Sequence, residues 1–128
     1  MNQIPIFPLL AQSDEVRGLI SNDDGTLRAF KFGFAGDDVQ MPYVVWRNIT
    51  GSAFNNINDR PSGDQIIVQI DIYDTDPDVV DQLAQAVRYA IELNCSILSY
   101  RDIEQDPDDR SYHIGFDVIW VLVRENGI

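Results

Sequence analysis

Aspartates at the spacing of metal ligands are the first residues in this chain that suggest chemistry. Asp74, Asp76 and Asp78 reproduce the D-x-D-x-D opening of a calcium-binding loop. Such a loop also needs a glycine at its sixth position and a bidentate glutamate at its twelfth, where this chain has Val79 and Gln85. The motif therefore predicts a helix N-cap with charge that suits the helix dipole, and no calcium site.

Cys95 and His113, the single cysteine and the single histidine, are the next candidates. Too few ligands are available for a zinc site. A Cys95–His113 nucleophile pair would need a third group that orients the histidine and a loop that stabilises an oxyanion, and neither is evident. We interpret them as a lone buried thiol and a strand histidine, and we expect no catalytic residue, cofactor or metal. An enzyme of unrecognised class that uses this pair and a carboxylate remains an alternative.

Hydrophobic periodicity predicts the elements that position these side chains. Spacings of three and four predict a helix over residues 4–21, with Ser13 as a candidate second cap inside it. A second helix should begin after the N-cap Asp76, with Pro77 in the first turn and an apolar stripe over residues 79–91. Alternation predicts strands over residues 27–34, 42–49, 66–73, 96–104 and 112–124.

The order α-β-β-β-α-β-β predicts an α+β fold. Short connections favour a mainly antiparallel sheet of about five strands, with two helices packed on one face. A length of 128 residues suits a single domain over residues 1–128. A chain of this size buries about 68% of its surface on folding, which is enough for a core without disulfide or metal.

Net charge excludes several classes of partner. The chain has 21 acidic and 9 basic residues and a formal charge of −12. Such a surface repels nucleic-acid phosphates and anionic lipid, so we expect neither specific nucleic-acid binding nor membrane binding. The first residues lack the pattern of a signal peptide, and no apolar run has the length of a membrane span. We therefore expect a soluble protein made in the cytoplasm.

Two polar loops are candidate surfaces for a protein partner. Residues 50–63 read as a long polar loop, which is uncommon in a compact domain unless it is functional or mobile. The candidate contacts there are Asn55, Asn56, Asn58, Asp59 and Arg60. An acidic hairpin tip supplies the second set, Asp106, Asp108, Asp109 and Arg110. Its carboxylates could hold a weak divalent ion, although such tips are usually only solvated.

The order of these elements and several short motifs carry a family resemblance. In chain order the motifs are Ile6-Phe7-Pro8-Leu9-Leu10, Phe30-Lys31-Phe32-Gly33, Pro42-Tyr43-Val44-Val45-Trp46, Asp59-Arg60-Pro61, Val68-Gln69-Ile70-Asp71-Ile72-Tyr73, Leu83-Ala84-Gln85-Ala86-Val87-Arg88 and Tyr112-His113-Ile114-Gly115-Phe116-Asp117-Val118. Over residues 4–120 the chain resembles the tail terminator (tail completion) proteins of long-tailed bacteriophages and prophages.

The resemblance implies a structural protein of the virion and no enzyme. It implies a homo-hexameric ring in the neck that caps the tail tube, ends tail polymerisation and presents a joining surface to the head–tail connector protein. DNA would pass through the ring without being specifically bound. Six copies at −12 each would carry −72, and an acidic lumen would let DNA slide past. The alternative is a small acidic α+β protein-binding module unrelated to phage tails, which would be a monomer or a dimer.

Overall fold

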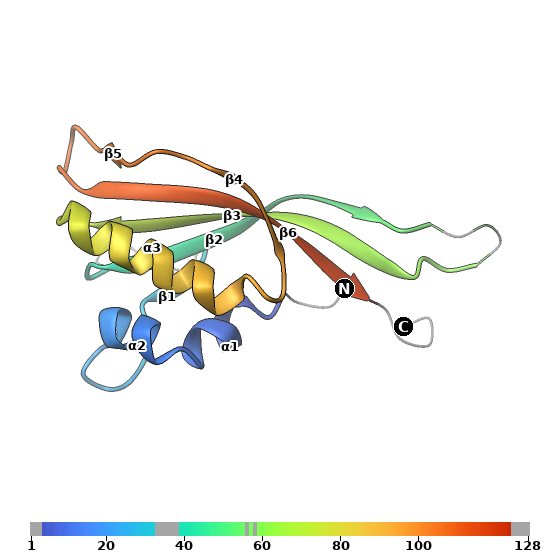
Figure 1. The fold of residues 1–128 in the computed structure, drawn as a ribbon, viewed down its shortest axis with the longest axis horizontal. Coiled ribbons are helices and arrows are strands. Elements are labelled where there is room, and N and C mark those ends of the chain that lie inside the picture. The colour runs from blue at the N-terminus through green and yellow to red at the C-terminus, as the bar shows by residue number, and fades with distance from the viewer. Residues whose placement is uncertain (1–3, 33–38, 56, 58, 124–128) are drawn as a thin grey trace.

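Figure 1 shows the chain as a computed structural model, in which one twisted sheet carries its helices on a single face. The structure describes residues 4–32, 39–55, 57 and 59–123. These residues form three helices and six strands. In chain order they are α1 (Ile6–Ala11), α2 (Asp14–Ile20), β1 (Ala29–Lys31), β2 (Tyr43–Ala53), β3 (Gly63–Asp74), α3 (Pro77–Ile91), β4 (Ser96–Tyr100), β5 (Glu104–Gln105) and β6 (Tyr112–Val123).

The sheet has the strand order β1-β2-β3-β6-β4, and β5 also pairs with β6. All of its pairings are antiparallel except that of β1 with β2. The α+β class and the mostly antiparallel sheet are therefore confirmed, with six strands and three helices in the described residues where about five and two were expected. The parallel pair is possible because the connection from β1 to β2 is much longer than a hairpin turn.

The core lies between the sheet and the helices. Ile66, Val68, Ile70 and Ile72 of β3 are each at most 5% exposed, as their alternation predicts. They belong to one apolar cluster with Phe116 and its neighbours on β6 and with the inner residues of all three helices. The inner residues of α3 are Val80, Leu83, Ala86, Val87 and Ile91.

Side-chain caps set the helix boundaries. The helix predicted over residues 4–21 is two helices, because the Ser13 hydroxyl accepts a 3.2 Å hydrogen bond from the Val16 N–H and begins α2. At α3, the Asp76 carboxylate accepts a 2.9 Å bond from the Asp78 N–H, and Pro77 occupies the first turn. Both caps were predicted from the sequence. Asp76, which belongs to the D-x-D-x-D run, thus acts as the helix N-cap that the sequence analysis expected.

The prediction of a polar loop over residues 50–63 is partly wrong, because both neighbouring strands extend into it. After a bulge between Asn48 and Thr50, β2 continues to Ala53, which pairs with Asp64 of β3. All residues of β2 from Arg47 onward are exposed, so the backbone ladder forms there without apolar side chains to direct it. The connection is therefore limited to residues 54–62.

Two other predicted strands also differ. The strand predicted over residues 27–34 is only β1, and residues 33 and 34 lie outside the described residues. The strand predicted over residues 96–104 is divided into β4 and β5, because the chain leaves its regular pairing at Arg101. The last strand is confirmed as β6 up to Val123, and residue 124 is not described.

Candidate assembly surfaces

The first candidate contact loop lies at the tip of the β2–β3 hairpin, which projects beyond the helices (Figure 1). Two backbone bonds close its base: the Phe54 N–H donates to the Gly63 carbonyl at 2.9 Å, and the Ser62 N–H donates to the Phe54 carbonyl at 3.1 Å. Beyond these bonds, the described residues 55, 57, 59 and 60 of the tip are exposed to solvent.

The described residues of this loop are exposed. Asn55, Asp59 and Arg60 all face solvent, and the Arg60 N–H donates to the Asp59 carboxylate at 2.7 Å. Two of the predicted contacts, Asn56 and Asn58, lie outside the described residues. Ile57 is 94% exposed, and the sequence analysis did not select it. An apolar side chain so far out of the core is a better contact candidate than the polar residues beside it.

The second candidate loop connects β5 to β6 and is ordered by its own carboxylates. The Asp106 carboxylate accepts a 2.9 Å bond from the Asp108 N–H, and the Asp109 carboxylate accepts bonds from the Ser111 N–H and hydroxyl at 2.9 and 2.7 Å. The hydroxyl bond, followed by the backbone bond, lowers the pKa of Asp109. Arg110 has a φ of 60°. These carboxylates stabilise a turn, and no group able to hold a metal occurs in the described part of the chain.

The two loops lie at opposite ends of the long axis of the molecule (Figure 1). The β2–β3 tip is at one end, and the β5–β6 loop lies beside the start of β6 at the other. The structure therefore does not bring the predicted contacts into a single site. It separates them into two surfaces that two different partners could occupy at once.

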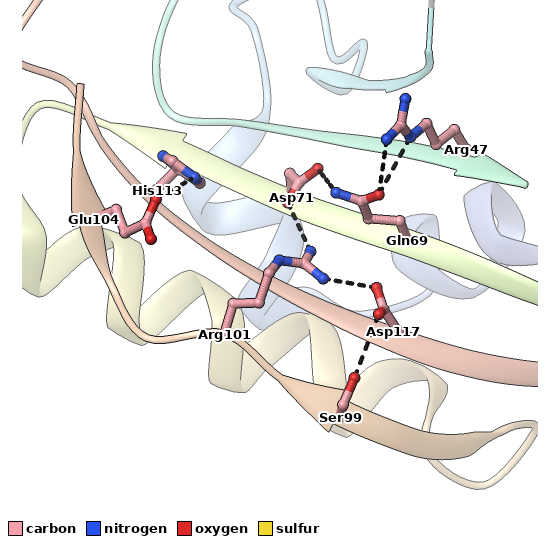
Figure 2. Close-up of polar contacts among 8 residues, drawn as sticks. All are labelled: Arg47, Gln69, Asp71, Ser99, Arg101, Glu104, His113 and Asp117. Atoms are coloured by element: carbon pink, nitrogen blue, oxygen red, sulfur yellow. Dashed lines mark hydrogen bonds and ion pairs between the residues drawn. The ribbon is translucent and has the colours of Figure 1, made fainter. Parts of the chain in front are cut away.

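The face of the sheet opposite the helices carries a polar network that the sequence analysis missed (Figure 2). Arg47 of β2 donates to the Gln69 side-chain oxygen at 3.2 and 3.1 Å, and the Gln69 amide donates to Asp71 at 3.0 Å. Arg101 then donates to Asp71 at 3.0 Å and to Asp117 at 2.8 Å. The network thus crosses β2, β3 and β6 without a break.

The guanidinium of Arg101 lies over a glycine. A Cβ atom on Gly115 would overlap Nη2 of Arg101 and the Asp71 carboxylate, so only glycine leaves room for this ion pair. Partial burial favours a lower pKa for Arg101, but the hydrogen bonds and charges of Asp117 and Asp71 outweigh it and raise the pKa. The arginine therefore remains charged and joins two carboxylates that would otherwise repel each other.

Aromatic rings extend the same face toward the β5–β6 loop. Tyr43 stacks on Tyr73 with ring centroids 5.0 Å apart, and Tyr73 stacks on His113 at 5.3 Å. Nε2 of His113 is 3.8 Å from the Glu104 carboxylate (Figure 2). Desolvation first, and then the nearby charge of Asp109, raise the pKa of Tyr43. The open face is therefore aromatic at one end and ionic in its middle.

The nucleophile pair considered from the sequence does not form. Ser96, which follows Cys95, lies opposite Ile119, six residues along β6 from His113, so thiol and imidazole are about 20 Å apart. The Cys95 thiol donates to the Ile91 carbonyl at 3.4 Å. Burial, with a smaller effect of Glu92, raises the pKa of the thiol to about 11. A thiol of this pKa is protonated at neutral pH and is a poor nucleophile.

A signal for the open-face network was present in the sequence. Gln69, Asp71 and Tyr73 alternate with the apolar residues of β3, and His113 and Asp117 do the same on β6. That pattern predicts a polar face, but it does not say which strands are neighbours. The partner of both carboxylates, Arg101, lies outside any strand, and periodicity gave no reason to choose it.

Comparison with known families decides which class of protein presents these surfaces. The family model described as tail completion protein gp17 matches residues 4–122, nearly the whole chain. This chain belongs to the tail completion protein family. None of the curated proteins compared with it is similar enough to count as a match.

As a tail completion protein, the chain has a role in the assembly of phage tails and interacts with other structural proteins of the virion. The resemblance inferred from its motifs is thereby confirmed. No helix in the described residues is long and apolar enough to cross a membrane. The contacts to be explained are therefore those between protein surfaces in a tail.

Proposed function

We propose that this tail completion protein is a tail terminator, a homo-hexameric ring that caps the last ring of the tail tube. The ring ends tail polymerisation and offers its other face to the head–tail connector protein. Its role is structural rather than catalytic, and its place is the neck of the virion. Family membership makes this proposal stronger than the alternative of a small acidic binding module unrelated to phage tails.

The observation that carries the proposal is the placement of the two candidate loops. A terminator must contact one partner on each side, and the exposed loops of this molecule lie at opposite ends of its long axis (Figure 1). Each end presents a surface of different chemistry. The β2–β3 tip displays Ile57, which is 94% exposed, whereas the β5–β6 loop displays Asp108, Asp109 and Arg110.

Charge placement bears on the passage of DNA through such a ring. On the open face, Asp71 and Asp117 both pair with Arg101, and Glu104 lies 3.8 Å from Nε2 of His113. Exposed acidic residues gather instead on the helices and in the loops, as Asp14, Glu15, Asp23, Asp24, Asp78, Asp81, Glu92, Asp102, Asp108 and Asp109 illustrate. We therefore expect an acidic lumen only if the helices and loops face it, and in that arrangement DNA would pass without specific binding.

Electron microscopy of tail tubes assembled with the purified protein tests the proposal. We expect rings at one end of each tube and tubes of arrested length. Tubes that grow without limit in the presence of the protein would contradict a terminator. Capped tails that fail to accept heads or purified connector would contradict the joining role alone.

Variants at the two ends separate the two contacts. Ile57→Asp and Asp108→Lys each alter an exposed side chain, so both proteins should fold normally. Because each end would contact a different partner, we expect one of these two variants to impair capping of the tube and the other to impair joining to the connector. Leu93→Asp is the matched control, because Leu93 is 96% exposed and belongs to the connection from α3 to β4, a segment that lies away from both ends of the molecule (Figure 1). Equal behaviour of all three variants would refute the placement of the two partner contacts at the two ends of the molecule.

A further inference from the structure

The sheet has an uncovered edge on β2. In the described residues, β1 pairs with β2 only from Val44 to Trp46. No described strand lies beside the outer edge of β2 from Asn48 to Ala53, and every residue there is exposed. A shallow groove lined by Asn48, Ile49, Ser52, Ala53, Asp64 and Ile66 lies over this part of β2 and its neighbour β3.

A second uncovered edge lies on β6 at the same level. The described pairings of β4 with β6 end at Ile119, although β6 continues beside β3 to Val123. Val121 is 50% exposed and Val123 is 70% exposed. The end of the sheet that projects past α3 is thus three strands wide, and both of its sides are open in the described residues (Figure 1). We call this part the arm; it comprises β2 from Asn48, β3 up to Ile67 and β6 from Ile119.

The pairing pattern shows which backbone groups point outward from the arm. The Phe54 N–H bonds to Gly63 on β3, so by alternation Gly51 and Ala53 direct their N–H and C=O groups away from β3. On β6 the Gly115 carbonyl accepts from the Arg101 N–H on the β4 side. Val121 and Val123 are an even number of residues from Gly115 along β6, so they also direct their backbone N–H and C=O groups to that outer side. Each edge therefore offers donors and acceptors for a further strand.

These edges lack the devices that usually protect a strand edge. Residues 48–54 and 118–123 contain no charged residue and no proline, in a chain that is 23% charged. Charges, prolines and edge lysines are the common means of preventing strand addition. Exposed Val121 and Val123 make the β6 edge apolar, whereas the β2 edge is uncharged and mostly polar, with Ile49 as its exposed large apolar side chain. An acidic chain that keeps two opposite edges free of charge is suited to pairing with its own kind.

We propose that the β2 edge of one copy pairs with the β6 edge of a second copy, so that the arms form a continuous sheet from subunit to subunit. The proposal rests on the terminator function, because it names the interface that would close the ring. The two edges are different surfaces on opposite sides of one arm, which makes the contact heterologous, and heterologous contacts generate rings when they close.

Strand direction makes this arrangement specific. Both β2 and β6 run antiparallel to β3, so they point the same way within one copy. Copies related by rotation about a ring axis keep that direction, and β6 therefore meets the next β2 in parallel. Two-fold pairing would instead place β2 against β2, or β6 against β6, in antiparallel orientation.

The register of the arm suggests which residues meet. Ser52 and Val121 both lie opposite Gln65 of β3, so they stand at the same height on the two edges. A closed ring has no rise from copy to copy. If the strands run along the ring axis, Ser52 of one copy lies beside Val121 of the next. If the strands are tilted from the axis, the register shifts and Thr50 takes the place of Ser52 beside Val121. All three side chains lie on the open face of the sheet.

Cysteine cross-linking on capped tail tubes tests the pairing. Single-cysteine variants Ser52→Cys, Thr50→Cys and Val121→Cys are made in a Cys95→Ser background and oxidised, singly and mixed. We expect a covalent dimer only when a β2 variant is mixed with Val121→Cys, since neighbouring strands place Cα atoms within disulfide range. A chain with both cysteines should yield a ladder of oligomers. Leu93→Cys, exposed on the helical side, controls for random collision.

The outcomes separate this inference from the proposed function. Capped tubes without mixed dimers would overturn the edge pairing and leave the terminator function intact. Dimers from β2 variants alone, or from Val121→Cys alone, would show two-fold pairing and also overturn it. As a second measurement, Val121→Lys with Val123→Lys should shift the assembled species from ring mass to monomer mass while far-UV circular dichroism is unchanged. Cross-linked rings that do not cap tubes would contradict the function and not the interface.

Discussion

Gly115 on β6 lies under the side chain of Arg101, and a Cβ atom on Gly115 would overlap the guanidinium. The missing side chain lets Arg101 reach over β6 to Asp71 on the neighbouring strand β3, and it also pairs with Asp117, two residues further along β6. One glycine thus permits Arg101, from the connection between β4 and β5, to join carboxylates of β3 and β6 on a face that no described helix covers.

Gly115→Ala should therefore destabilise the protein through Arg101. The arginine can swing away because its end is flexible, so the expected loss is about 1 kcal/mol, the value of a partly exposed ion-pair network. Urea denaturation measures it. In an Arg101→Ala background the same change should be neutral or stabilising, because the main obstacle is gone and alanine suits a strand better than glycine. Gly18→Ala is the control: nothing lies within 4 Å of its added Cβ, and we expect a gain of about 0.5–1 kcal/mol in α2.

Arg28 should be far more sensitive than the exposed arginines. It is only 8% exposed and donates to the carbonyls of Leu19, Ser21 and Pro42 at 3.2, 3.1 and 2.9 Å. Arg28→Ala leaves these acceptors without their donor, and we expect a loss of about 2–4 kcal/mol in the free energy of unfolding. Arg28→Lys keeps the charge but cannot reach all of the acceptors, so it should rank between wild type and Arg28→Ala. A loss no larger than that of an exposed arginine would contradict this role.

Cys95 should be slow to alkylate in the folded protein. Its pKa of about 11 is above the value of a free thiol, so at pH 8 the reaction with iodoacetamide should be on the order of 100-fold slower than in urea. Because the folded pKa is the higher one, the contribution of the protonated thiol to stability is complete below the unfolded pKa. It is lost as the pH rises through about 11. Mass spectrometry follows the reaction, and equal rates in the two states would contradict the burial.

Arg110→Gly should raise stability. Arg110 has a φ of 60°, a conformation that is strained for a residue with a Cβ atom and unstrained for glycine. We therefore expect the free energy of unfolding to rise by about 0.5–1 kcal/mol, as measured by thermal or urea denaturation. Asp108→Gly is the control in the same loop, because Arg110 alone among the described non-glycine residues has a positive φ. If tube capping or head joining falls while stability rises, Arg110 is a direct contact at this end of the molecule.

Local chemistry was enough to predict several elements. The Asp76 cap, Pro77 and the apolar stripe define α3, and alternation defines β3 and β6, because these signals depend only on neighbours in the chain. Ser13 marked the start of α2 in the same way. The aspartates of the D-x-D-x-D run also supplied the predicted cap, because the Asp76 carboxylate accepts from the Asp78 N–H.

Only the tertiary structure decided where the surfaces lie. The outer half of β2 was read as loop because its residues are polar, and it is a strand because β3 supplies the hydrogen bonds. Arg101 meets Asp71 from thirty residues away, which no local pattern encodes. The same holds for the two uncovered edges and for the two loops at opposite ends of the molecule. Which strands are neighbours depends on packing between distant segments, so the sequence predicted the elements and the fold class, and the sheet order placed the surfaces for assembly.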